Sequence, residues 1–239
     1  MFKYVKAFFR GLYKIVLAYP KICRYSKRKD KYSFEERYSY LRKLVKIVFK
    51  SFNVEVNAKG MNLLSNDETH MFVSNHQGVM DALTLVYLFE KPMTFVSKIE
   101  VKKYPIIGKA CNMIDAIFID RDNIRDAVKM VKTSKEYLGM GRNVAIFPEG
   151  TRTKDDNYMP GEYKAGALKP AYETKNNMVV SVIDGSYKIF SKQYKRDLKI
   201  NIEFIDVLKP EHYLDRNTTE LSKEMQDKTT MKLKEIRKQ

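Results

Sequence analysis

One of the three histidines of the chain, His76, stands five residues before Asp81 in the stretch FVSNHQGVMDAL. The apolar residues before His76 predict a short strand, and those after Gly78 predict a helix with Asp81 in its first turn. The helix dipole stabilises a carboxylate there. If the imidazole folds back over that turn, Asp81 accepts a hydrogen bond from one ring nitrogen, and the other nitrogen can act as a general base. The alternative is a loop histidine and a helix-start aspartate that never meet.

Two further groups of polar residues follow predicted strands, where α/β sheets commonly place ligand sites. Arg121 comes just after the apolar run AIFID. The second group follows the apolar run VAIF and consists of Glu149, Gly150, Thr151 and Arg152, with Lys164 further on. Arginine can bind a phosphate through two parallel hydrogen bonds, and lysine acts as a mobile point charge. The two groups therefore indicate an anion site, the alternatives being a solvated surface arginine and a charged flexible loop.

Metal chemistry and a protein nucleophile are not favoured. A metal site needs several His, Cys or carboxylate side chains that converge, and His70 and His212 stand in unremarkable contexts. No Gly-x-Ser-x-Gly is present. Cys111 has no histidine near it in sequence, and with Cys23 it makes up the cysteine content, so we expect no disulfide and a reducing compartment. If His76 is a base, we expect it to activate a hydroxyl carried by the substrate.

The elements that must position these residues alternate between strand and helix from residue 54 onward. Strands are predicted over 53–60, 70–75, 92–98, 113–120, 143–150, 178–185 and 198–210. Helices are predicted over 79–89, 123–141, 164–174 and 217–238, the last with a possible kink. This alternation indicates an α/β fold over residues 54–239, with a central, mostly buried sheet flanked by helices.

Positive charge gathers near the N-terminus, where residues 1–60 hold 16 of the 45 Lys and Arg residues against 4 acidic residues. Apolar residues recur at helical spacing over 2–18 and 38–52 with cations opposite them, and Pro20 is expected to end the first helix. This pattern is typical of amphipathic helices at a membrane interface, so residues 1–53 are predicted to dock there. The alternatives are helices packed on the core and a nucleic-acid-binding arm. We expect neither a membrane-spanning segment nor a cleaved signal.

The stretches NHQGVMD, IFIDR and FPEGTR occur in an order and spacing that resemble the glycerolipid acyltransferases, most closely the bacterial 1-acyl-sn-glycerol-3-phosphate acyltransferases. The family motifs fall, in chain order, on His76 and Asp81, then Arg121, then residues 149–152. The segment SKIEVKKYPIIG resembles a lysine-containing family segment and places Lys98, and YKAGAL resembles a later one and places Lys164. The resemblance covers about residues 55–185, with Ser181 where the fourth family motif usually has proline.

The resemblance implies that His76 deprotonates the 2-hydroxyl of a lysophosphatidate while Asp81 holds the imidazole. The hydroxyl oxygen would then attack an acyl thioester of CoA or of acyl carrier protein, and no metal or cofactor is implied. The implied substrate site comprises Arg121, Arg152, Lys98 and Lys164 around the acceptor phosphate, together with Glu149, Gly150 and Thr151. Glu149 would orient the glycerol or support Arg152.

The implied setting is the cytoplasmic face of the cell membrane, with the protein peripheral rather than spanning. Its expected partners are the membrane surface, lysophosphatidate, the acyl thioester and acyl carrier protein, and no nucleic acid. Two alternatives stay open. One is a sister acyltransferase with another lipid acceptor, and the other is a non-catalytic module that binds anionic lipid or nucleic acid through the basic N-terminus.

Overall fold

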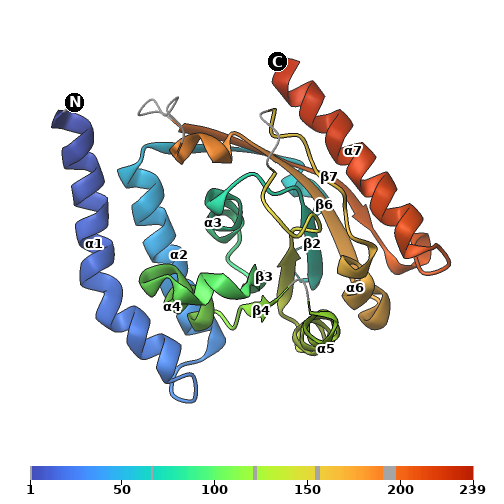
Figure 1. Ribbon diagram of the computed structural model, residues 1–239, viewed down its shortest axis with the longest axis horizontal. Helices are drawn as coiled ribbons and strands as arrows, with labels where there is room; N and C mark the ends of the chain where they lie inside the picture. Colours follow the sequence, from blue (N-terminus) through green and yellow to red (C-terminus); the bar gives the residue numbers. More distant parts are fainter. Residues whose placement is uncertain (1, 66, 121–122, 154–156, 191–197, 239) are drawn as a thin grey trace.

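The computed structural model describes residues 2–65, 67–120, 123–153, 157–190 and 198–238, and seven strands of this part form one sheet (Figure 1). The strands are β1 (Val54–Lys59), β2 (His70–Ser74), β3 (Met93–Lys98), β4 (Ile117–Ile119), β5 (Asn143–Ile146), β6 (Asn177–Asp184) and β7 (Leu198–Leu208). Their order in the sheet is β1-β7-β6-β2-β5-β3-β4. All neighbours are parallel except β6 and β7, so β2 to β6 have their carboxyl ends at one edge.

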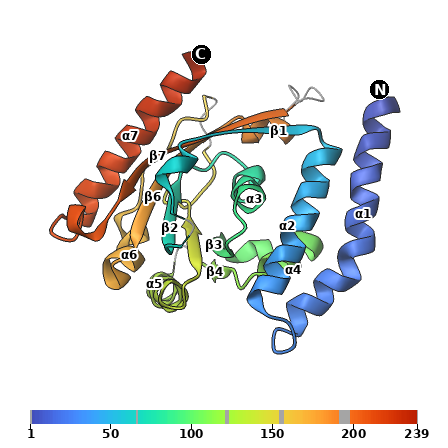
Figure 2. The ribbon, with the colours of Figure 1, turned by 180° about the vertical axis from the view of Figure 1, so that it is seen from behind.

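Helices cover both faces of this sheet (Figure 2). They are α1 (Phe2–Lys27), α2 (Phe34–Ser51), α3 (Val79–Leu88), α4 (Pro105–Met113), α5 (Ile124–Gly139), α6 (Lys169–Thr174) and α7 (Thr218–Lys238). The side chains of the central strand β2 alternate between the two faces of the sheet. Since helices cover both faces, all the residues of β2 are buried. Phe72 packs in a cluster with α2 and α3, while Met71 and Val73 pack in a cluster with α5 to α7. The predicted α/β fold with a mostly buried sheet is confirmed.

Two predicted elements differ from the structure. The strand expected over 113–120 is only β4, because α4 runs to Met113 and Asp115 adopts a left-handed turn with φ 53°. The helix expected over 164–174 is divided into a 3-10 turn, Ala165–Ala167, and the short α6. The helix α4 itself was not predicted, and its start follows the rule that proline suits the first helical position.

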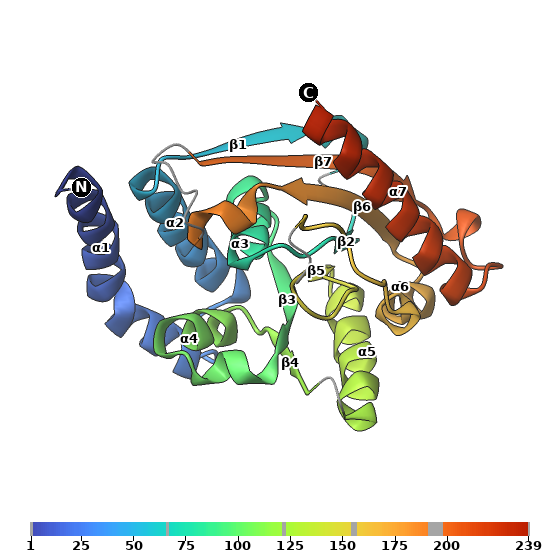
Figure 3. The same ribbon diagram turned by 45° about the horizontal axis from the view of Figure 1, so that its top comes forward.

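The expectation that Pro20 ends the first helix is wrong, since α1 continues through it to Lys27. A proline inside a helix removes one backbone hydrogen bond, so packing beyond it must compensate. Ile22 and Tyr25 supply this packing: they are buried, and the Tyr25 hydroxyl donates to Glu36 of α2 at 2.6 Å. Helix α1 thereby packs on α2 and on α4 (Figure 3).

The apolar face of α2 is directed into the protein. Leu41, Val45 and Phe49 belong to the same buried cluster as the sheet residue Phe72, so this face is not available to a membrane. Exposed apolar side chains lie instead on α1, where Tyr13, Val16 and Leu17 are 61%, 53% and 60% exposed. In the described part of the chain, no helix is long and apolar enough to cross a membrane. Residues 1–53 thus share a core with the sheet, and their separation as a domain stays a prediction.

A partly buried ion cluster joins the N-terminal helices to the sheet edge. Asp115 accepts from Arg37 of α2 at 3.0 Å and from Lys29 at 2.8 Å, with Arg142 at 3.4 Å. Arg37 also donates to the main-chain oxygen of Met113. Burial alone would raise the pKa of Asp115, but the hydrogen bonds from Arg37 and Lys29 outweigh it and hold that pKa below its usual value.

Asp115→Asn should lower the free energy of unfolding at pH 7 by about 1–3 kcal/mol, because Arg37 keeps its place and loses a charged partner. Asparagine tolerates the left-handed backbone, so the change isolates the charge. The folded pKa lies below the unfolded one, so the difference from wild type should vanish as the pH falls below about 3.9 and through the folded value. Urea titrations at several pH values would measure this. Glu90→Gln, which removes an exposed ion pair to Arg42, should change little.

Candidate active site

The loop after β2 carries His76 at the carboxyl edge of the sheet, between the ends of β5 and β6. Asn75 fixes the start of this loop because its amide side chain pairs with the backbone of Ile183, donating to the oxygen at 2.9 Å and accepting from the nitrogen at 2.8 Å. The side chain therefore extends the β2–β6 ladder by one residue. Gly78 then precedes α3, and Asp81 lies in the first turn of that helix.

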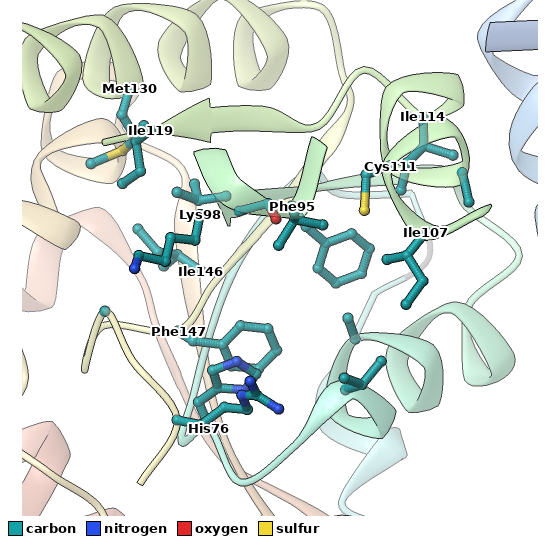
Figure 4. A pocket seen from close by; sticks show the side chains of 18 of the residues that line it. His76, Phe95, Lys98, Ile107, Cys111, Ile114, Ile119, Met130, Ile146 and Phe147 are labelled. Carbon is teal, nitrogen blue, oxygen red and sulfur yellow. The ribbon is translucent and has the colours of Figure 1, made fainter. Parts of the chain in front are cut away.

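His76 and Asp81 form the predicted pair. Nδ1 of His76 lies 2.7 Å from Oδ2 of Asp81, which also accepts from the backbone N–H groups of Gln77 and Gly78 at 2.7 and 2.8 Å. The carboxylate is fully buried, and three donors converge on one oxygen. Since a carboxylate only accepts, Nδ1 carries the proton and Nε2 is left as an acceptor. The imidazole also stacks on the ring of Phe147, with centroids 4.3 Å apart (Figure 4).

Glu149 supports the same loop from the other side. Its Oε1 accepts from the backbone N–H of His76 at 2.7 Å, and its Oε2 accepts from Thr153 Oγ1 and Gly161 N, each at 2.9 Å. Burial raises the pKa of Glu149, and these hydrogen bonds oppose that effect. Both oxygens therefore have protein donors and the side chain is buried, while the expected contact with glycerol or Arg152 stays a prediction.

A cavity of about 1360 Å³ opens beside His76. Figure 4 shows Lys98 on one side of the His76 and Phe147 rings, and Phe95, Ile107 and Cys111 on the other. The apolar side reaches the helices α1 to α4, with a wall that includes Ile15, Leu44, Val48, Leu83 and Ile107. The cavity is thus apolar toward the N-terminal helices and cationic toward the ends of β3 and β5.

Five of the predicted anion-site residues line this cavity, namely Lys98, Gly150, Thr151, Arg152 and Lys164. Gly150 adopts φ 70°, a left-handed conformation that favours glycine, and its N–H bonds to the oxygen of Phe147. Lys98 pairs with the exposed Glu100 at 2.6 Å. Arg121 lies outside the described residues, so its predicted contact stays a prediction.

Other chemistries find little support in the site. Burial raises the pKa of the Cys111 thiol to about 11, so this residue lines the cavity as a protonated, weakly nucleophilic group. Among the described residues, no group of three or more His, Cys, Asp or Glu is placed to hold a metal ion. Both cysteines are free thiols.

Sequence reasoning missed three residues that hold the loop of His76. Phe147 and Gln77 adjoin predicted motifs, so their closeness in sequence was a usable signal, whereas Asn75 looked like the end of a strand. Ser181, at the position of the usual family proline, lies in β6 at a register shift and is buried. Its main-chain oxygen accepts from the Ser74 hydroxyl at 3.1 Å, so it contributes to the β2–β6 joint.

Known proteins resemble this chain in sequence. A "Probable 1-acyl-sn-glycerol-3-phosphate acyltransferase" of Mycoplasma genitalium is 39% identical over 107 residues, which are 43% of this chain and 39% of that protein. The 1-acyl-sn-glycerol-3-phosphate acyltransferase of Borreliella burgdorferi is 26% identical over 82% of this chain and 79% of its own length. Three of these alignments span only 37–54% of the relatives' own length.

The fold is shared with a solved structure, the 1-acyl-sn-glycerophosphate acyltransferase PlsC from Thermotoga maritima. The two structures superpose with a TM-score of 0.74 over 98% of each chain, at 19% sequence identity. The family model named Acyltransferase matches residues 55–184, which is more than half of the chain and includes both His76 and Glu149. On this evidence, the chain belongs to the acyltransferase family.

Proposed function

We propose that this chain is a membrane-peripheral O-acyltransferase. It transfers an acyl group from a thioester to the sn-2 hydroxyl of 1-acylglycerol-3-phosphate and so forms phosphatidate. The observation that carries this is the His76–Asp81 pair at the wall of a cavity that is apolar on one side and cationic on the other. Family membership supports the reaction type, and the names of the relatives support the acceptor.

In the proposed reaction, Nε2 of His76 takes the proton of the acceptor hydroxyl as the oxygen attacks the thioester carbonyl. Asp81 stabilises the imidazolium that forms. The tetrahedral intermediate then expels the thiolate, which receives the proton from His76, so no acyl group is ever attached to the protein. The backbone N–H groups of residues 76–78 all donate to Glu149 or Asp81, so other donors must stabilise the oxyanion.

His76→Ala should lower kcat by about 10²–10⁴-fold, the usual contribution of a general base. Acyl transfer to lysophosphatidate, measured with acyl-CoA and with acyl carrier protein thioesters, would test this. His212→Ala is the control because His212 is exposed and lies outside the cavity, and its kcat should not change. Near-normal transfer by a folded His76→Ala protein would refute the proposed base.

The cationic side of the cavity supports a phosphorylated acceptor. Lys98, Arg152 and Lys164 come from the end of β3 and from the segment after β5, and all three line the same space as His76. Arg152 and Lys164 are exposed to solvent. A phosphate of the acceptor that bound to them would displace this solvent. A phosphate held there would place the glycerol near the imidazole.

Arg152→Ala should raise KM for lysophosphatidate about 10–100-fold, the loss expected for one charge-assisted hydrogen bond. KM for the acyl donor should change less than threefold, since the donor is bound by its apolar chain. With monoacylglycerol, which lacks the phosphate, wild type and variant should be alike. An equal effect on both acceptors would rule out a phosphate contact at Arg152.

Membrane contact is proposed for α1, the helix with the exposed Tyr13, Val16 and Leu17. Its other side, at Ile15 and Ile22, lines the apolar end of the cavity. An acyl chain could therefore pass from the bilayer into the cavity beside this helix. Lys14 and Lys21 add charges that attract anionic headgroups, as on the cytoplasmic face of a cell membrane.

Leu17→Asp should weaken binding to anionic vesicles about tenfold or more, because one buried leucine contributes about 1.5–3 kcal/mol. Vesicle co-sedimentation measures this. Met231→Asp on α7 is the matched control, since Met231 is 58% exposed and lies on the opposite face of the sheet, and it should bind like wild type. Equal binding by the Leu17 variant would exclude this surface. Deleting residues 1–50 is a poorer test because it removes core residues of α2.

A further inference from the structure

The C-terminal helix α7 packs along β6, and its last turn reaches the carboxyl end of that strand. Arg237, in the last turn of α7, donates to Oδ1 of Asp184 through Nε at 3.1 Å and Nη2 at 2.8 Å. Its Nη1 donates to the main-chain oxygen of Asn157 and lies 3.6 Å from Met159 Sδ. One guanidinium therefore joins the end of β6 to the segment 157–161.

The first connection from Arg237 to the site runs through Gln77, the residue after His76. Asp184 Oδ1 also accepts from Gln77 Nε2 at 3.2 Å, and that nitrogen lies 3.3 Å from the oxygen of Tyr158. Gln77 Oε1 accepts from Gly185 N at 3.0 Å. The side chain is buried, and its backbone N–H is one of the three donors to Asp81. Arg237 thus holds two of the groups that bind the Gln77 side chain, one directly and one through its neighbour in the chain. It contacts Asp184, and it contacts Asn157, the neighbour of Tyr158.

The second connection runs through the segment 157–161. The oxygen of Met159 lies 2.9 Å from Thr153 Oγ1, and the N–H of Gly161 donates to Glu149 at 2.9 Å. Glu149 in turn accepts from the backbone N–H of His76. Both connections therefore end on the peptide that carries the catalytic imidazole.

We propose that Arg237 is a positioning residue for His76, acting from α7 through Asp184 and Gln77; we call these three residues the α7 latch. The proposal rests on the function proposed for His76. Asp184 is buried, and its ion pair in the described structure is with Arg237, so loss of the guanidinium leaves a buried charge with the neutral Gln77 amide as its remaining side-chain donor. The segment 157–161 loses a contact at the same time. A general base displaced by even about 1 Å can lose much of its effect.

Arg237→Ala should lower kcat about tenfold or more while KM for lysophosphatidate and for the donor stays within about twofold, since Arg237 does not line the cavity. Arg237→Lys keeps the charge but cannot form the forked contact to Asp184 and Asn157, so it should give an intermediate kcat.

Lys232→Ala is the matched control. Lys232 lies on the same helix and pairs with Glu203 and Glu235, but it has no contact with segment 157–161 or with β6 among its ion pairs. It should leave kcat unchanged. A loss of kcat equal to that of Arg237→Ala would mean that any weakening of α7 has the same effect, and the latch would be rejected.

Hydrogen exchange followed by mass spectrometry tests the latch without acyl transfer. Arg237→Ala should speed exchange in peptides covering 74–80 and 157–163 and leave α5 unchanged. His76→Ala should lower kcat about 10²–10⁴-fold without speeding exchange in 157–163, so failure of the proposed base and failure of the latch give different results. Unchanged exchange in both peptides, or a raised KM with normal kcat, would overturn the proposal.

Discussion

The burial of one carboxylate determines the geometry of this site. Asp81 has no exposed surface, and a buried charge is costly unless hydrogen bonds compensate it, which here all reach Oδ2. The three donors are the imidazole of His76 and the backbone N–H groups of the next two residues, so the loop must curl over the start of α3 to supply them. The same requirement fixes the ring, its tautomer and the entry of the chain into the helix. The same three hydrogen bonds therefore determine both the shape of the loop and the orientation of the imidazole.

The order of strands explains why that loop is held from two sides. β2 lies between β5 and β6, so residues that end those strands flank the loop. Glu149, after β5, binds the backbone of His76, and Asp184, at the end of β6, binds the side chain of Gln77. Each acidic residue is itself held by a distant segment, Gly161 in one case and Arg237 in the other. If β2 had other neighbours in the sheet, Glu149 and Asp184 would no longer flank the loop of His76.

Local patterns predicted the features whose partners are close in sequence. The β2 strand and the start of α3 follow from apolar runs, and the place of Asp81 follows from the preference for a carboxylate in a first helical turn. The pairing of His76 with Asp81 was one of two readings that the sequence left open. Pro20 and the apolar face of α2 were misjudged, because both depend on packing against α4 and the sheet. Arg237 carried no signal, since 53 residues separate it from Asp184 and its neighbours in sequence are those of any basic helix end.

Two adjacent residues of helix α1 lie on different sides of the helix, one at the cavity and one at the outer surface. Ile15 belongs to the cavity wall, while the next residue, Val16, is 53% exposed. Successive residues on a helix project about 100° apart. A rotation of α1 about its axis would therefore move Ile15 out of the cavity wall and, at the same time, move Val16 away from the outer surface. The inner dimension of the cavity and the orientation of the outer surface are thus coupled within a single rigid element. A substitution that repacks α1 on α4 would alter both together, so the size of the cavity and the direction of the exposed apolar side chains cannot vary independently.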